Sequence, residues 1–127
     1  MDLILDTNAL SAIAEGEPDA AKQFYRAGRV AIPVIVLGEY RFGIAQSRHQ
    51  HEYERWLEEM VSVCDVLGIS EETAIWYAEL RSQLKNAGTP IPSNDVWIAA
   101  LCRQHTLSIL SRDRHFDLVK GLRRLDW

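Results

Sequence analysis

The stretch LILDTN, residues 3–8, places an acid directly after a short apolar run. Leu3-Ile4-Leu5 contains no polar residue, which is typical of a strand buried on both faces of a sheet. Residues 7–14 then have a helix-like pattern, which Gly16 ends. A buried strand that leads into a helix is the building unit of parallel α/β sheets, so this stretch indicates the class of fold.

The same alternation of short apolar runs and helix-like stretches continues along the chain. Further strands are expected at residues 30–32, 61–67, 107–110 and 122–125. Helices are expected at residues 18–27, 33–44, about 49–60, 70–86, and from Ser93 or Asn94 as N-cap to about residue 101. The pattern predicts a three-layer α/β/α fold around a mostly parallel sheet of four to five strands. It leaves the order of the strands open.

Length and composition indicate one globular unit. With 127 residues, 47% of them apolar, we expect residues 1–127 to form a single domain. The longest apolar stretch, residues 30–37, is interrupted by Pro33 and too short to cross a bilayer, and no signal peptide is visible. Cys64 and Cys102 form no CxxC pair and are expected to be core residues of a reducing compartment. These features predict a cytoplasmic protein without a membrane segment.

The net charge of −4 is the opposite of what a basic nucleic-acid-binding module shows. A negative net charge is nevertheless compatible with nucleic-acid binding where several acids are gathered in one site and neutralised by a metal ion. Without four such acids, the 14 remaining acids would balance the 14 lysines and arginines. Charge alone therefore does not exclude a nucleic acid as a ligand.

Four acids stand near the expected ends of parallel strands. Asp6 follows the first strand and Asp113 the fourth, while Asp95 lies in the first turn of the helix before the fourth strand. Glu39 lies in the helix after the second strand, within an otherwise apolar stretch where an unpaired buried acid would be costly. Ligands of parallel sheets bind beyond the carboxyl ends of the strands, so one edge of the sheet can bring all four acids together.

Four neighbouring carboxylates require protons or a cation, because each pair about 4 Å apart repels by ~4 kcal/mol at an effective dielectric constant of roughly 20. No histidine or cysteine joins the four at a ligand spacing, which argues against zinc. Oxygen ligands alone suit hard cations such as Mg²⁺ or Mn²⁺. The reaction that fits is hydrolysis of a phosphodiester by a metal-activated water.

Each acid taken alone also has a structural interpretation. Asp6 could cap the first helix, and Asp95 could interact with a helix dipole. Asp113 could be a turn residue, and Glu39 could pair with Arg41. The four together favour a shared site.

The sequence at these positions resembles the PIN domain family, and more closely the VapC-type toxins of bacterial toxin–antitoxin pairs. The resemblance covers nearly the whole chain and rests on LDTN at residues 5–8, GEY at 38–40 with GI at 43–44, NDVWIAA at 94–100 and LSRDRHF at 110–116. It implies a PIN-like fold with strand order 3-2-1-4-5. It further implies an endoribonuclease that uses Mg²⁺ or Mn²⁺ with the acids Asp6, Glu39, Asp95 and Asp113. A homodimer and an antitoxin partner whose tail blocks the site are also implied.

Four further polar residues match positions beside the acids in this family. Thr7 is expected to bind a water or a phosphate oxygen, and Asn94 either supports the site or caps its helix. Ser111 keeps a hydroxyl where the family often has threonine or asparagine. Asp117 is a candidate for a further acid, although a surface acid is the preferred interpretation.

Three basic residues surround the fourth acid. Arg112 and Arg114 are candidates for holding RNA phosphate, with solvated loop cations as the equal alternative. His115 could act as a general acid, but we predict an ordinary surface histidine.

Three other functions are alternatives to that of a toxin. An aspartyl phosphatase of the haloacid dehalogenase type needs a second acid at position 8, which is Asn8, and a dedicated lysine. A non-catalytic α/β binding module would leave Glu39 and Asp95 unexplained. A PIN ribonuclease of RNA processing, without an antitoxin, is the stronger alternative.

If the chain is a toxin, residues 34–60 are expected to supply an antitoxin groove through Tyr40-Phe42 and Trp56-Leu57.

Overall fold

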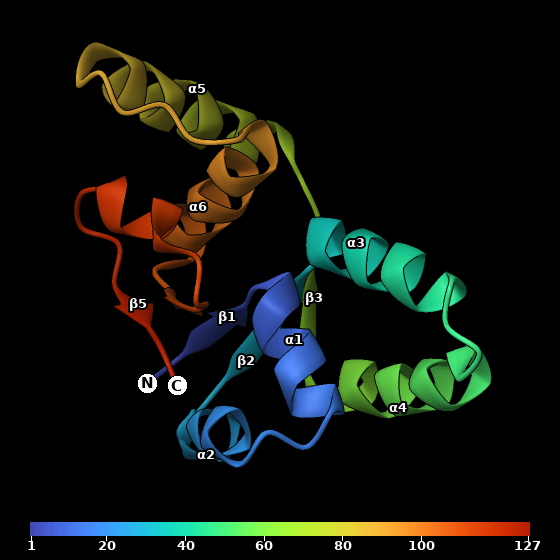
Figure 1. Ribbon diagram of the computed structural model, residues 1–127. Coiled ribbons are helices and arrows are strands. Elements are labelled where there is room, and N and C mark those ends of the chain that lie inside the picture. Colours follow the sequence, from blue (N-terminus) through green and yellow to red (C-terminus); the bar gives the residue numbers. More distant parts are fainter.

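Five strands form one sheet, and all of them run in the same direction (Figure 1). In the computed structural model, which describes residues 1–127, the strands are β1 (Leu3–Leu5), β2 (Val30–Pro33), β3 (Asp65–Leu67), β4 (Ser108–Leu110) and β5 (Arg124–Leu125). Their order across the sheet is β3-β2-β1-β4-β5, and every neighbouring pair is parallel. The predicted α/β class is confirmed, and so is the strand order that the family resemblance implies.

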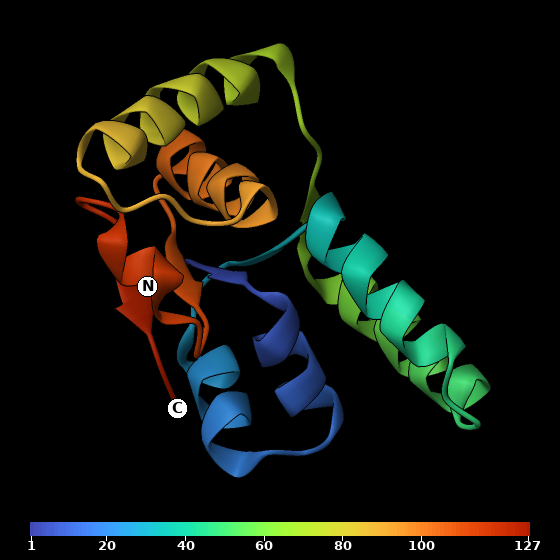
Figure 2. The ribbon, with the colours of Figure 1, turned by 45° about the horizontal axis from the view of Figure 1, so that its top comes forward.

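Helices cover both faces of this sheet. They are α1 (Thr7–Ala14), α2 (Pro18–Arg26), α3 (Val34–Ala45), α4 (Gln50–Val63), α5 (Glu71–Asn86), α6 (Ser93–His105) and the 3₁₀ helix η1 (Arg114–Leu118). In both views α5 and α6 lie together on one side of the sheet, and α1 to α4 lie on the other (Figures 1 and 2). The chain passes from β1 through β2 to β3 and then returns to β4, and right-handed crossovers therefore place the two groups on opposite faces.

Several element boundaries differ from the sequence-based prediction: α6 continues to His105 instead of about residue 101, and β5 begins at Arg124 instead of residue 122. The strand expected at residues 61–67 begins only at Asp65, because α4 continues to Val63. Leu57 and Met60 are buried one turn apart, so the helical face extends into the apolar run that resembled a strand. At the start of α6, Pro92 is the N-cap, and neither Ser93 nor Asn94 caps the helix with its side chain.

The core forms where the sheet meets its helices. All three residues of β1 are buried, and so are most residues of α6 from Asp95 to Cys102. Cys102 is buried and Cys64 is partly buried, and both are free thiols, as predicted. None of the helices combines the length and apolar character that crossing a membrane requires. The central strands β1 and β4 are thus held rigidly, together with the residues that follow them.

Candidate active site

A polar hollow of about 430 Å³ opens beyond the carboxyl ends of β1 and β4. Apart from Pro92, every residue that lines it is polar or charged. Its walls are Asp6, Thr7, Asn8, Ser11, Glu39, Pro92, Asn94, Asp95, Asp113 and His115. All four predicted acids therefore face one cavity, at the edge of the sheet where the topology was expected to bring them.

Asp6 serves the fold and the site together. Its Oδ1 accepts a hydrogen bond from the backbone N–H of Thr7 at 2.9 Å, which caps α1. Its Oδ2 accepts from the hydroxyl of Ser111 at 2.6 Å and from Asn8 Nδ2 at 3.2 Å. Burial raises the pKa of Asp6, and the hydrogen bonds from Ser111 and Thr7 oppose that rise only in part. The nearby acids Asp113 and Glu39 raise the same pKa further.

Asp95 is the second buried acid, with 5% of its surface exposed. It lies in the first turn of α6, where the helix dipole favours a negative charge. Burial nevertheless raises the pKa of Asp95, and the nearby carboxylates of Asp113 and Asp6 add to the rise. A hydrogen bond with His115 acts in the opposite direction.

Glu39 is exposed, which corrects the expectation of an acid buried in an apolar stretch. The apolar neighbours Val36 and Tyr40 face the core, while Glu39 lies at the edge of that buried face of α3 and reaches the hollow. Its Oε2 accepts from the Thr7 hydroxyl at 3.1 Å, and its Oε1 accepts from Asn94 Nδ2 at 3.2 Å. Glu39 is therefore held by two polar side chains of the site and forms no ion pair with Arg41.

Ser111 connects the first acid to the fourth. Its buried hydroxyl donates to Asp6 and accepts from the backbone N–H of Asp113 at 2.9 Å. Asn8 strengthens this connection, because its Oδ1 accepts from the backbone N–H of Arg112 at 3.1 Å. This role of Asn8 was not predicted from the sequence, although its position two residues after Asp6 indicated a residue close to the site. The link fixes the loop after β4 against the start of α1.

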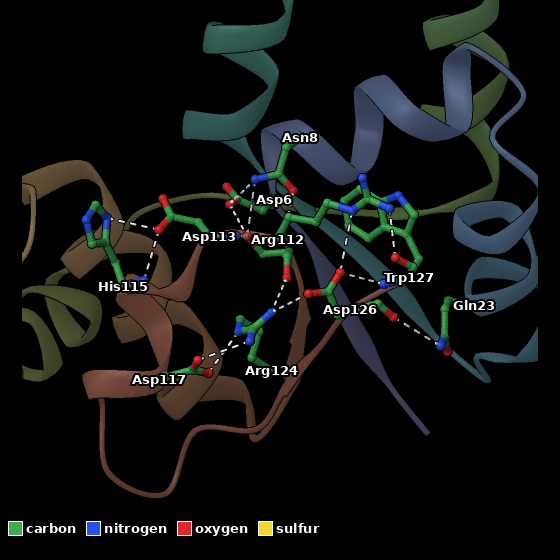
Figure 3. A network of polar contacts seen from close by, with 11 residues as sticks. Asp6, Asn8, Gln23, Arg112, Asp113, His115, Asp117, Arg124, Asp126 and Trp127 are labelled. Atoms are coloured by element: carbon green, nitrogen blue, oxygen red, sulfur yellow. Dashed lines mark hydrogen bonds and ion pairs between the residues drawn. The ribbon is translucent and has the colours of Figure 1, made fainter.

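His115 is part of the site, so its assignment as an ordinary surface histidine is wrong. Its Nδ1 lies 3.0 Å from Asp95 Oδ2 and 3.0 Å from Asp113 Oδ1. Its backbone N–H also donates to Asp113 Oδ1 at 2.9 Å, which caps η1 (Figure 3). Hydrogen bonding to Asp95 raises the pKa of His115, and the charge of Asp113 adds to the rise. The sequence shows that His115 stands two residues after Asp113, but the contact of His115 with Asp95 depends on tertiary structure.

Asp117 lies outside the hollow and pairs with Arg124 instead. The carboxylate of Asp117 accepts from Arg124 Nε at 2.8 Å and from Arg124 Nη2 at 3.0 Å (Figure 3). This hydrogen bonding lowers the pKa of Asp117. The structure places Asp117 where the preferred interpretation, a surface acid, expects it.

The two arginines that flank Asp113 also lie outside the lining of the hollow. Arg112 stacks over the Trp127 ring, with its guanidinium carbon 4.5 Å from the ring centroid, and its Nε lies 3.5 Å from Asp126 Oδ1. Arg114 is exposed at the start of η1. Arg112 therefore has structural partners in the C-terminal segment, and Arg114 extends toward solvent.

The donor set of the hollow fits a divalent cation. One ligand atom each from Asp95, Asp113 and His115 lies within 4.8 Å of the other two. The carboxylates of Asp6 and Glu39 line the same cavity and supply further oxygen donors. The expectation that no histidine joins the acids at a ligand spacing is thus wrong, because His115 lies together with Asp95 and Asp113. Mostly oxygen donors around an open polar hollow suit an octahedral ion that acts on phosphate.

Comparisons with known proteins give a consistent result. The model of the PIN domain family matches residues 3–122. The chain is 28% identical to the tRNA(fMet)-specific endonuclease VapC of Shigella flexneri, over 100% of the chain and 98% of that protein. It is 33% identical to ribonuclease VapC4 of Mycobacterium tuberculosis, over 67% of each.

Similarity extends to solved structures. The crystal structure of DNA-bound VapBC from Salmonella typhimurium contains a chain that is 26% identical, with a TM-score of 0.87. The match covers 100% of this chain and 98% of that one. The fold of this chain is therefore one that is already known.

Proposed function

Because the chain belongs to the PIN domain family, and within it to the VapC ribonucleases, we propose that it is the toxin of a type II toxin–antitoxin pair and requires Mg²⁺ or Mn²⁺ to cut RNA. The observation that carries the catalytic part is the convergence of Asp6, Glu39, Asp95 and Asp113 on one polar hollow. No lysine or arginine lines that hollow to neutralise them. A cation is the partner that such a site lacks.

The residues of the site have distinct tasks in this proposal. The divalent ion, when bound, supplies a Lewis acid and an activated water for attack on the phosphodiester. Asp6 and Asp95 would hold the ion, because both are buried and fixed by hydrogen bonds. Glu39 would orient the attacking water, since Thr7 and Asn94 hold its carboxylate at the solvent side of the hollow. Arg114, which has no carboxylate partner, would contact RNA phosphate.

The rival phosphatase lacks support at the site. Asn8 donates to Asp6 instead of providing a second acid, and no lysine lines the hollow. An RNA-processing ribonuclease without an antitoxin would use the same catalytic residues and the same chemistry as a toxin, so the presence of an antitoxin partner is what separates the two functions.

The nuclease proposal is tested by mapping RNA ends after brief expression of the chain. We expect new ends at a small set of sites in cells that express the wild type, and none in cells that express Asp95→Asn at the same level. The variant controls for expression stress, because it removes one charge and little volume. Identical RNA ends in the two samples would reject cleavage by this site.

The surface for an antitoxin differs from the sequence-based expectation. Leu57 is fully buried between α3 and α4, so it belongs to the core and cannot line an open groove. Tyr40 is 4% exposed and contributes to the wall of a small hollow. Phe42 is 72% exposed, and Trp56 is partly buried against Tyr40. A hollow of about 240 Å³ does lie between α1, α3 and α4, and the buried Tyr40 hydroxyl at its wall has no hydrogen-bond partner. We propose that an antitoxin helix covers this hollow.

The antitoxin is expected to block the hollow with a basic side chain near its tail, because a cationic group satisfies the acids without a metal ion. Co-expression with the small reading frame next to the gene should yield a stable complex that does not cleave RNA. Removing the tail of the partner should restore cleavage while the complex persists. Full activity of the intact complex, or no complex at all, would reject the toxin–antitoxin role and leave the nuclease role in place.

The wider proposal concerns the state of the free protein. We propose that residues 1–127 act as one PIN domain in the cytoplasm and associate as a homodimer. Light scattering on the purified chain tests the dimer, for which we expect twice the chain mass of 14.5 kDa. A mass of one chain across the micromolar range would contradict it.

A further inference from the structure

We propose that His115 provides a nitrogen ligand in this site and thereby makes it prefer a divalent transition-metal ion over Mg²⁺. The inference rests on the proposed metal-dependent nuclease function and makes it more specific. It starts from the position of one ring nitrogen between two acids of the cluster.

The Nδ1 atom of His115 lies between two carboxylates, at a place where a bound cation could interact with all three groups. Nδ1 lies 3.0 Å from Asp95 Oδ2 and 3.0 Å from Asp113 Oδ1. A ring nitrogen carries at most one hydrogen, so it cannot donate a full hydrogen bond to both carboxylates. A cation bound to the nitrogen and both oxygens would satisfy all three atoms together.

The spacing matches the coordination geometry of small divalent ions. In an octahedral site with ligands at about 2.1 Å, neighbouring ligand atoms lie about 3 Å apart. The two distances from Nδ1 have this value, and the three ligand atoms lie within 4.8 Å of one another. Small movements of the side chains would therefore suffice for His115, Asp95 and Asp113 to share one ion.

The fold holds the imidazole at this place. The backbone N–H of His115 donates to Asp113, and the first turn of η1 thereby fixes the two residues relative to each other. Asp95 comes from α6 and is only 8% exposed in its side chain, whereas the His115 side chain is 47% exposed. The buried acid offers a fixed ligand, and the exposed side of the ring leaves space for water and substrate.

A nitrogen ligand changes which ion the site binds best. Mg²⁺ favours oxygen ligands, whereas transition metals also bind imidazole well. Mn²⁺ lies at the weak end of the transition series, so it is the most demanding probe of the preference. We expect the wild type to bind Mn²⁺ more tightly than Mg²⁺, and we expect the ratio of the two affinities to fall when the nitrogen ligand is removed.

The experiment measures Mn²⁺ binding to the full chain without RNA. Free Mn²⁺ is quantified by electron paramagnetic resonance, with Mg²⁺ as competitor, and pulsed spectra of bound Mn²⁺ report coupling to a directly bound nitrogen. His115→Gln replaces the imidazole by an amide of similar reach. His51→Gln is the matched control, because His51 is exposed on α4, outside the hollow.

The expected result is nitrogen coupling in the wild type and in His51→Gln, and its loss in His115→Gln together with the weaker preference for Mn²⁺. Bound Mn²⁺ without nitrogen coupling in the wild type would overturn the role of His115 and leave the metal site intact. Tighter binding by His115→Gln would also overturn it, because the imidazole would then compete with the ion. Failure of the wild type to bind either ion would instead reject the metal-dependent function.

Discussion

Replacing Asp6 by asparagine is expected to reduce RNA cleavage on the order of a thousandfold, the scale seen when one charged or polar group that stabilises a transition state is removed. Asp6 lies at the end of β1 with its Oδ2 bonded to Ser111 and Asn8, so the carboxylate has one fixed orientation toward the hollow. An asparagine keeps the shape of the side chain, and its oxygen can still cap α1, but it removes the negative charge and one of the two acceptor oxygens. The loss should therefore appear in the rate constant of cleavage, measured on a labelled RNA at saturating metal.

The same change is expected to stabilise the metal-free protein at neutral pH. Burial raises the pKa of Asp6 in the folded state above its ordinary value of 3.8. As pH increases from below 3.8, the unfolded chain ionises first, so the free energy of unfolding falls until the folded-state pKa is passed. Asparagine has no such ionisation penalty. Urea unfolding in chelator should show Asp6→Asn to be more stable than the wild type at pH 7, with a difference that shrinks toward pH 3.

Asp117→Asn is the matched control for these measurements. It is the same chemical change at an acid that pairs with Arg124 outside the hollow. We expect cleavage within about twofold of the wild type, since an exposed ion pair contributes roughly 0–1 kcal/mol. Cleavage by Asp6→Asn at the rate of Asp117→Asn would contradict the assignment of the site.

The sequence was informative where function depends on strand ends. Asp6, Asp95 and Asp113 could be placed at one edge of a parallel sheet because each stands next to a strand or a helix start, and the topology of such sheets is restricted. The structural interpretations of Asp6 and Asp113 proved compatible with the shared site, because both cap an element and line the hollow.

The sequence was less informative where the result depends on the rotation of a helix or on a long-range contact. Glu39 was expected to be buried, but it is exposed. It directly precedes the buried Tyr40 in α3, and successive residues of a helix are rotated by about 100°, which places Glu39 at the surface. His115 meets Asp95 across 20 residues of sequence, a contact that no local pattern encodes. The α3–α4 packing likewise removes Leu57 from the predicted antitoxin groove and leaves Tyr40 at the wall of a small hollow.

Removing divalent ions is expected to abolish cleavage by the wild type and to leave the protein folded. The hollow contains four acids and one histidine, and without an ion the carboxylates face one another with only His115 and neutral donors between them. Nothing in the lining other than a bound ion can lower the pKa of an attacking water to near neutrality, so activity in chelator should fall to the background of RNA hydrolysis.

Adding Mg²⁺ or Mn²⁺ back should restore cleavage in a saturable way, and the same ions should raise the midpoint of thermal unfolding because they bind only the folded state. The Asp6→Asn variant is the control for the second effect: with one acid lost, its melting temperature should respond much less to either ion. Full cleavage in excess chelator would show that the acids act without a metal ion. A melting temperature that rises equally in the wild type and the variant would show that the ions bind elsewhere. Because activity and stability are measured on the same protein with the same ions, agreement between the two titration midpoints would assign both effects to the hollow beyond β1 and β4.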